Sequence, residues 1–205
     1  MSIKLYDDAL LEKLKEWTKK IKGMHIYGPN NTIQLFEITA DETKDKPIKL
    51  PIITLTRPGG YTILNPNKNV RTYDGAMTDS DEQYSFTLNS IPIQIDYKLD
   101  VYTRKFEEAD VYMRELIFNF INHPTLHITI PYNSLNREHV ATVRISNNVE
   151  DNSDVPEMHF KYGQFTRFSL DINIDDAYLW SVRKRNNVYI EDTADIEIIQ
   201  KLYWF

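Results

Sequence analysis

Two aspartates in a segment of alternating polarity are the first side chains whose spacing could support catalysis. Asp96 and Asp100 both occupy polar positions in IPIQIDYKLDV, so they fall on one face of an expected strand. Four residues at about 3.3 Å each separate them by about 13 Å, whereas the carboxyl pairs of glycosidases lie roughly 5 to 9.5 Å apart. We therefore expect both carboxylates to be solvated or at an interface.

A run of acidic and amide residues resembles the start of a calcium-binding loop. Asp171, Asn173 and Asp175 have the alternation of its first three ligands. Asp176 stands where that loop needs glycine, and Val182 stands where it needs a bidentate glutamate. The isoleucines that alternate with these residues predict a strand instead of a calcium site.

Other arrangements that could bind a metal or a nucleotide are incomplete. His123 and His127 have the spacing of two zinc ligands on a helix, but Pro124 would break that helix. Cysteine is absent, and so are the glycine-rich, serine-hydrolase and zinc-protease motifs. The sequence thus predicts no catalytic, cofactor-binding or metal-ligating residue and no cofactor, and we expect a protein that is not an enzyme.

Length and charge limit the remaining classes. The chain of 205 residues is long enough for one sizeable domain. Thirty acidic and 24 basic residues give a net charge of −6, which argues against a protein that coats nucleic acid. We identify no secretory leader and no apolar run of the roughly 18 residues that a membrane span needs. We expect synthesis in the cytoplasm and no membrane partner.

The elements that must position any site begin with an amphipathic helix over residues 8–21. Asp7 or Asp8 is expected to cap its first turn, and Gly23 is placed to end it. The apolar stripe of this helix consists of Leu10, Leu14, Trp17 and Ile21.

Residues 24–65 predict strands, with a charged loop at 41–46 and β-forming residues at 48–56. The polar segment 65–83 predicts a long loop that leaves the core, which is typical of disordered or functional loops.

The segment 91–131 predicts a strand, a helix and a second strand. Residues 91–101 alternate with period two, and the apolar period then becomes helical until Pro124. Residues 126–130 alternate again, which predicts the second strand. The apolar positions of the helix are Ala109, Tyr112, Met113, Leu116, Phe120 and Ile121.

Later strands are predicted at 140–145, 159–165 and 168–174. Strands therefore outnumber helices, and the predicted fold class is α+β. We expect a mixed, mostly antiparallel sheet with the N-terminal helix and the central helix packed on it. A single domain should span residues 1–180 and carry the long loop at 65–83.

Residues 181–205 are predicted to form a C-terminal extension or arm, because polar residues at 181–187 interrupt the strand pattern. The chain closes with large apolar side chains that would expose several hundred Å² of apolar surface in water. They are expected to dock on the subunit's own core or on a neighbouring subunit, and both options stay open. The candidate interface residues are Tyr203, Trp204, Phe205, Tyr178 and Trp180.

The order of these elements resembles the tail terminator and neck (head–tail joining) proteins of long-tailed bacteriophages. The resemblance rests on an amphipathic first helix, the segment 91–131 and the closing strand RFSLDINIDDAYLW, and it covers most of residues 5–180. In that family a small α+β subunit carries a helix on a sheet. Six copies form a ring that caps the tail tube and meets the head connector.

The resemblance implies a structural virion protein that forms a homo-oligomeric ring, a hexamer, and is made in the host cytoplasm. Its partners would be other tail, neck or connector proteins, and DNA would pass nearby without specific binding. One alternative is another structural protein of the tail or baseplate. Another is a monomeric ligand-binding module or enzyme that uses Asp96, Asp100 and Arg104.

Overall fold

The computed structural model of the chain describes residues 2–29, 50–64, 71–79, 82–132, 135–153 and 165–185. The chain divides into two compact units, one of Met1–Asn69 with Ile91–Leu179 and one of Val70–Ser90 with Trp180–Phe205. The first unit has a hydrophobic core, whose buried residues run from Tyr6 to Ala177. Neither described helix is long and apolar enough to cross a membrane.

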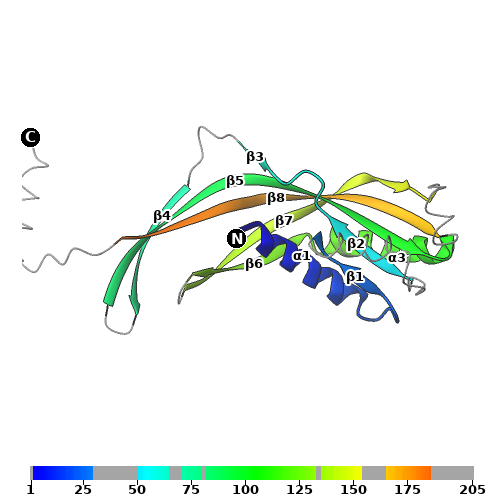
Figure 1. Cartoon of the computed structure of the whole chain (residues 1–205), viewed down its shortest axis with the longest axis horizontal. Coiled ribbons are helices and arrows are strands. Elements are labelled where there is room, and N and C mark those ends of the chain that lie inside the picture. Colours follow the sequence, from blue (N-terminus) through cyan, green and yellow to red (C-terminus); the bar gives the residue numbers. More distant parts are fainter. Residues whose placement is uncertain are drawn as a thin grey trace, which may run out of the picture. The chain divides into compact units, whose positions relative to one another are not determined.

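The strands of the described part form one curled sheet with the order β1-β2-β5-β8-β7-β6, and β3 and β4 also pair with β5 (Figure 1). Strands β1 and β2 are parallel, whereas β5 pairs antiparallel with β2, β3 and β4, and β7 with β6 and β8. This sheet and the two helices confirm the predicted α+β class. The strands are β1 (His25–Tyr27), β2 (Ile52–Thr56), β3 (Thr62–Ile63), β4 (Arg71–Asp79), β5 (Glu82–Thr103), β6 (Thr125–Tyr132), β7 (Leu135–Asp151) and β8 (Thr166–Arg185).

Helix α1 (Ser2–Thr18) lies on one face of the sheet and buries Tyr6, Leu10 and Leu14 completely. It begins earlier and ends earlier than the predicted helix 8–21. The cap assigned to Asp7 or Asp8 is wrong because both residues lie inside the helix, and the side chain of Asp7 is buried. Gly23 follows the helix with φ 78°, a conformation that suits glycine after a helix end.

Helix α3 (Phe106–Asn122) shares the core with α1, because the Phe120 ring meets the Trp17 ring edge to face at 4.9 Å. Four of its predicted core residues are buried, Ala109, Met113, Leu116 and Phe120. Ile121 was predicted on the same face, and this is wrong because its side chain is 61% exposed. One residue turns a helix by about 100°, so Ile121 is carried away from the stripe of Phe120.

The alternation predicted for two strands is confirmed. The core side of β5 consists of Ile93, Ile95, Tyr97, Leu99 and Val101, and the core side of β8 of Phe168, Leu170, Ile172 and Ile174. Both sets belong to the cluster that α1 and α3 cover. The residues between them therefore point to the sheet face away from the helices.

The loop predicted over 65–83 is wrong for the described residues 71–79 and 82–83. Residues 71–79 form β4, which pairs with the first part of β5 from Arg71 opposite Ser90 to Asp79 opposite Glu82. Strand β5 therefore begins well before residue 91. The polar composition of this hairpin hid it, because strand formation depends on cross-strand partners more than on local preference.

Strand β8 continues to Arg185, so the predicted interruption at 181–187 is wrong for residues 181–185. The predicted loop 41–46, nearly all of the predicted strand 159–165 and residues 186–205 lie outside the described residues. The assignment of a single domain to 1–180 and an arm to 181–205 stays a prediction.

Candidate functional site

The sheet face away from the helices carries a continuous set of polar side chains, which we call the polar face. Its residues alternate with the core residues of β5 and β8, and the register of β7 with β8 places Glu150 opposite Ser169 and Arg144 opposite Asn173. The polar face consists of Gln94, Asp96, Lys98 and Asp100 of β5, Arg144 and Glu150 of β7, and Arg167, Ser169, Asp171, Asn173 and Asp175 of β8.

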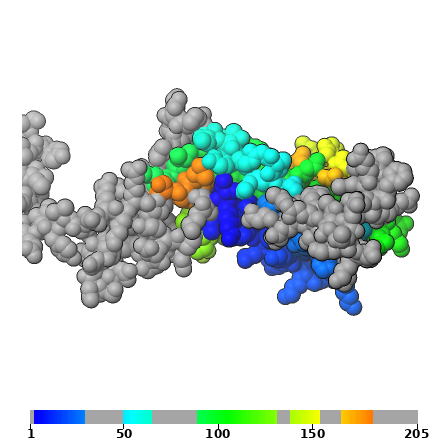
Figure 2. Space-filling view, viewed as in Figure 1, coloured from blue at the N-terminus to red at the C-terminus, as the bar shows by residue number. Residues whose placement is uncertain are grey.

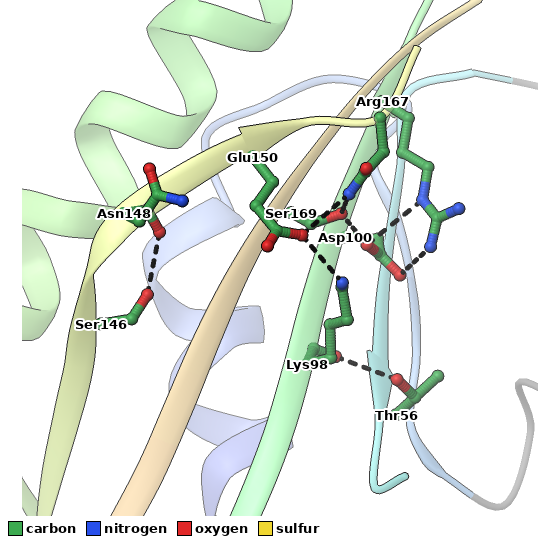
Figure 3. Close-up of polar contacts among 9 residues, drawn as sticks. Thr56, Lys98, Asp100, Ser146, Asn148, Glu150, Arg167 and Ser169 are labelled. Carbon is green, nitrogen blue, oxygen red and sulfur yellow. Dashed lines mark hydrogen bonds and ion pairs between the residues drawn. The ribbon is translucent and has the colours of Figure 1, made fainter. Parts of the chain in front are cut away.

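Asp100 is the most buried charge of the polar face, with 3% of its surface exposed. The Arg167 guanidinium donates two hydrogen bonds to the Asp100 carboxylate, from Nε to Oδ1 at 3.3 Å and from Nη2 to Oδ2 at 3.1 Å (Figure 3). The hydroxyl of Ser169 donates a third hydrogen bond to Oδ1. A buried carboxylate is stable only with such partners, so this cluster ties β5 to β8.

The cluster extends from Ser169 to β7. The amide of Asn152 donates to the Ser169 hydroxyl at 2.8 Å and to Glu150 Oε2 at 3.2 Å. Lys98 Nζ lies 3.1 Å from the same Glu150 oxygen (Figure 3). The hydrogen bond from Asn152 and the charge and hydrogen bond of Lys98 lower the pKa of the Glu150 carboxyl. One hydrogen-bonded chain of side chains thus crosses three strands.

The same cluster perturbs an arginine and a tyrosine. Burial opposes the charge of Arg167, but the hydrogen bond and the charge of Asp100 outweigh it and raise the pKa of the guanidinium. The guanidinium also lies over the Tyr102 ring, 5.5 Å from its centre. Burial, followed by the charge of Asp100, raises the pKa of Tyr102 to about 12. Both groups keep their usual protonation state at neutral pH.

Asp96 and Asp175 of the polar face also have polar partners. Asp96 Oδ1 accepts hydrogen bonds from Gln94 Nε2 at 3.0 Å and from the Asn173 amide. Arg144 Nε lies 2.6 Å from Asp175 Oδ2. Five acidic and three basic side chains give the polar face a formal net charge of −2.

A second buried carboxylate lies on the other side of the sheet, beneath α1. Asp7 Oδ1 accepts a hydrogen bond from the Tyr97 hydroxyl at 2.7 Å, and Arg57 Nη1 lies 3.1 Å from both Asp7 oxygens. Burial raises the pKa of Asp7 despite these partners, and burial together with the charge of Asp7 raises the pKa of Tyr97. Figure 2 shows α1 next to residues 50–64 on one surface. The cluster joins α1 to β5 and to Arg57, which follows the end of β2.

Asp7 is not among the candidate site residues predicted from the sequence, although its position in the sequence carries a signal. Asp7 lies three residues before Leu10 and seven before Leu14, on the buried stripe of α1. An acidic residue on such a stripe needs a hydrogen-bonding partner, but the partner, Tyr97, is ninety residues away and belongs to another element.

The structure does not join Asp96, Asp100 and Arg104, which had been weighed as a ligand-binding site. Asp96 accepts hydrogen bonds from Gln94 of its own strand and from Asn173 of β8. Asp100 accepts its hydrogen bonds from Arg167 and Ser169 of β8. Arg104 is exposed between β5 and α3 and forms no ion pair with either aspartate. Both carboxylates are hydrogen-bonded within the sheet, so Asp96, Asp100 and Arg104 do not come together as a ligand-binding site.

Two of the five predicted interface residues are described. Tyr178 and Trp180 are both half-buried on β8. The backbone N–H of Tyr178 donates to the Tyr6 hydroxyl at 2.8 Å, and its ring meets the His139 ring edge to face. Tyr178 is thus partly engaged within its own subunit, while Tyr203, Trp204 and Phe205 lie outside the described residues.

Metal ligation finds no support among the residues that the structure describes. They contain no group of three or more histidine, aspartate or glutamate side chains placed to hold a metal ion. Asp171, Asn173 and Asp175 belong to β8, which confirms that this run is a strand. His123 follows the end of α3 and His127 lies in β6, so no single helix carries both.

Comparison with known proteins supplies no family for this chain. No protein-family model matches the sequence, and a search of curated proteins finds no match.

Proposed function

We propose that this chain is a ring-forming structural subunit of a bacteriophage virion, located at the tail end or neck where tail and head join. Six copies would surround the path of the DNA, and the subunit would act through its surfaces without catalysis. The observation that carries this proposal is the polar face, whose three cations each pair with a carboxylate.

A surface past which DNA moves must not hold phosphate groups. Lysine and arginine that contact phosphates supply most of the non-specific affinity for DNA. On the polar face Lys98, Arg144 and Arg167 each pair with a carboxylate, and the net charge of −2 repels a polyanion. We therefore assign the polar face to the inner surface of the ring.

A ring subunit must also offer an edge to its neighbour, and β6 ends the described sheet. The N–H of Val143 donates to the Pro124 carbonyl at 2.7 Å, so these two residues form a hydrogen-bonded pair of the β6–β7 ladder. In an antiparallel ladder every second residue points its backbone N–H and C=O groups toward the partner strand, and the residues between them point these groups away. The backbone groups of Thr125, His127 and Thr129 consequently point away from β7. Lys13 Nζ donates to the Thr125 carbonyl, so His127 and Thr129 remain to pair with a neighbouring chain.

Assembly of the full-length protein tests the proposal. Size-exclusion chromatography with light scattering and negative-stain microscopy, alone and with purified tail tubes, should reveal a closed ring of about six subunits. Thr129→Pro should abolish the ring, because proline removes an outward N–H without disturbing the ladder to β7. Thr129→Ser is the matched control and should assemble like the wild type.

Two results would contradict the proposal. One is a protein that stays monomeric at every concentration and also with tail tubes present. The other is mass spectrometry of purified particles that finds the chain in infected cells but not in virions. A ring that persists in Thr129→Pro would reject the β6 edge as the contact.

A further inference from the structure

Helix α3 is apolar on two sides, and only one of them faces the core. Val111, Phe118 and Ile121 point outward, with 38%, 60% and 61% of their surface exposed. Their spacing of seven and three residues places them along one stripe of the helix, which we call the outer stripe. No element in the described part of the chain covers the outer stripe. Large exposed apolar groups in such a row are typical of a protein contact.

The outer stripe carries opposite charges at its centre. Arg114 and Glu115 are exposed and lie between Val111 and Phe118, within one turn of each. Neither forms an ion pair with another described residue. The stripe therefore presents an apolar group, a charge pair and an apolar group in sequence.

This order makes the outer stripe complementary to itself. When two copies of α3 lie antiparallel about an axis between residues 114 and 115, Arg114 of each copy faces Glu115 of the other. In the same register Val111 of each copy faces Phe118 of the other, and Ile121 faces the aliphatic stem of Glu108. We propose that the outer stripe binds the outer stripe of a second copy of this chain, antiparallel and with two-fold symmetry.

The acidic start of α3 selects the antiparallel direction. Glu107, Glu108 and Asp110 lie in its first turns, and its last turn has no basic residue. A parallel pair would bring three acids against the same three acids, which is destabilising. The antiparallel pair places Glu107 beside Asn122, Glu108 beside Ile121 and Asp110 beside Asn119 of the other copy, so no acid faces an acid. The two helix dipoles then oppose each other.

The contact is small and leaves the polar face open. A helix of 17 residues is about 25 Å long, so one helix pair lies at the low end of the sizes of specific interfaces. We expect a dissociation constant in the micromolar range. Because α3 covers the opposite face of the sheet, the dimer leaves the polar face free. The dimer is thus separate from the ring proposed above.

Charge exchange tests the register. Arg114→Glu places two acids opposite each other on both sides of the axis, and Glu115→Arg places two arginines there. In sedimentation equilibrium each variant alone should dimerise about tenfold more weakly than the wild type, and an equimolar mixture should recover the affinity as a heterodimer. Lys22→Glu, an exposed change of the same charge outside α3, is the control. Equal affinity of all these proteins would overturn the proposal.

Engineered cysteines test the geometry independently, because the natural chain contains none. Under mild oxidation, a mixture of Val111→Cys and Phe118→Cys proteins should cross-link faster than either protein alone. Tyr61→Cys, exposed on another surface, should cross-link slowly. Equal rates for the mixture and the single variants would reject the antiparallel register.

The same cross-link separates the dimer from the ring. It should form equally in a Thr129→Pro background, because the α3 contact does not use β6. Its loss there would show that it reports a ring contact and would overturn the two-fold dimer. Its persistence in a protein that forms no ring would support the dimer while the ring proposal fails.

Discussion

Two buried aspartates show how single residues connect distant parts of this chain. The Asp100 carboxylate accepts hydrogen bonds from the Arg167 guanidinium and the Ser169 hydroxyl. The Asp7 carboxylate accepts them from the Tyr97 hydroxyl and the Arg57 guanidinium. Each cluster joins at least two elements, so removal of one partner leaves a buried polar group unpaired. These clusters specify the position of α1 and the alignment of β5 with β8.

Asp7 should give the stability of the protein a measurable pH dependence. Its pKa in the folded chain lies above the ordinary value of 3.8, so the folded state binds the proton more tightly than the unfolded state. The free energy of unfolding of the wild type, relative to Asp7→Asn, should therefore fall as pH rises from about 3.8 through the folded pKa. Urea unfolding at a series of acidic pH values measures this difference.

Glu150 supplies a control with the opposite sign. Its pKa is lowered in the folded chain, so its contribution is present above the ordinary value of 4.5 and is lost as pH falls through the folded pKa. The stability of the wild type relative to Glu150→Gln should thus rise with pH. If both differences had the same slope, the assigned environment of Asp7 would be wrong.

At the scale of the element, α3 shows that an apolar residue type does not tell which side of a helix is buried. Phe120 is 2% exposed and packs on Trp17, whereas Phe118, two positions away, is 60% exposed. Two residues turn the helix by about 200°, so the two rings point in nearly opposite directions. The helix thus has one apolar side for its own core and another that stays exposed.

This arrangement predicts unequal effects for the same substitution. Phe120→Ala should destabilise the fold by about 3 to 5 kcal/mol, because it removes a buried ring and leaves a cavity. Phe118→Ala should change the stability by less than about 0.5 kcal/mol under dilute conditions. Chemical denaturation at low protein concentration compares the two variants. Similar losses for both would mean that Phe118 is covered within its own subunit.

At the scale of the whole molecule, the chain divides into two compact units. The buried cluster of the first unit runs from Tyr6 to Ala177, and the hairpin formed by β4 and the start of β5 belongs to the second unit. Separate compact units of a chain often open and close as separate cooperative units. The first unit should therefore fold without the full length of this hairpin.

Shortening the hairpin tests that expectation. Asp74 lies opposite Thr87, so residues 75–86 can be replaced by Asn-Gly, a sequence that favours a tight turn between paired strands. The free energy of unfolding of the first unit should change by less than about 1 kcal/mol. Circular dichroism during urea titration provides the measurement. A collapsed spectrum would show that the hairpin is needed to fold the core.

Much of the fold could be predicted because the strongest patterns are local. The period of two in residues 91–101 and 168–174 marked one buried face in β5 and in β8, and the helical period marked most of the core side of α3. These patterns depend only on where consecutive side chains point in a strand or a helix. The hairpin of β4 was missed because its evidence is a cross-strand partner rather than a local period.

The candidate site was less predictable, for the same physical reason. The sequence placed Asp96 and Asp100 on one polar face, but it contained no indication that Arg167, Ser169 and Asn173 would meet them from β8. Nor did it pair Asp7 with Tyr97.

The sequence by itself determined the α+β class, the strands with alternating core residues and the excess of acidic over basic residues. These properties follow from residue type and short-range geometry. Only the tertiary structure decided which charges neutralise one another, which side of α3 stays exposed and which strand edge is open. Those properties depend on contacts between residues that are distant in the chain, and such contacts exist only once the sheet has formed.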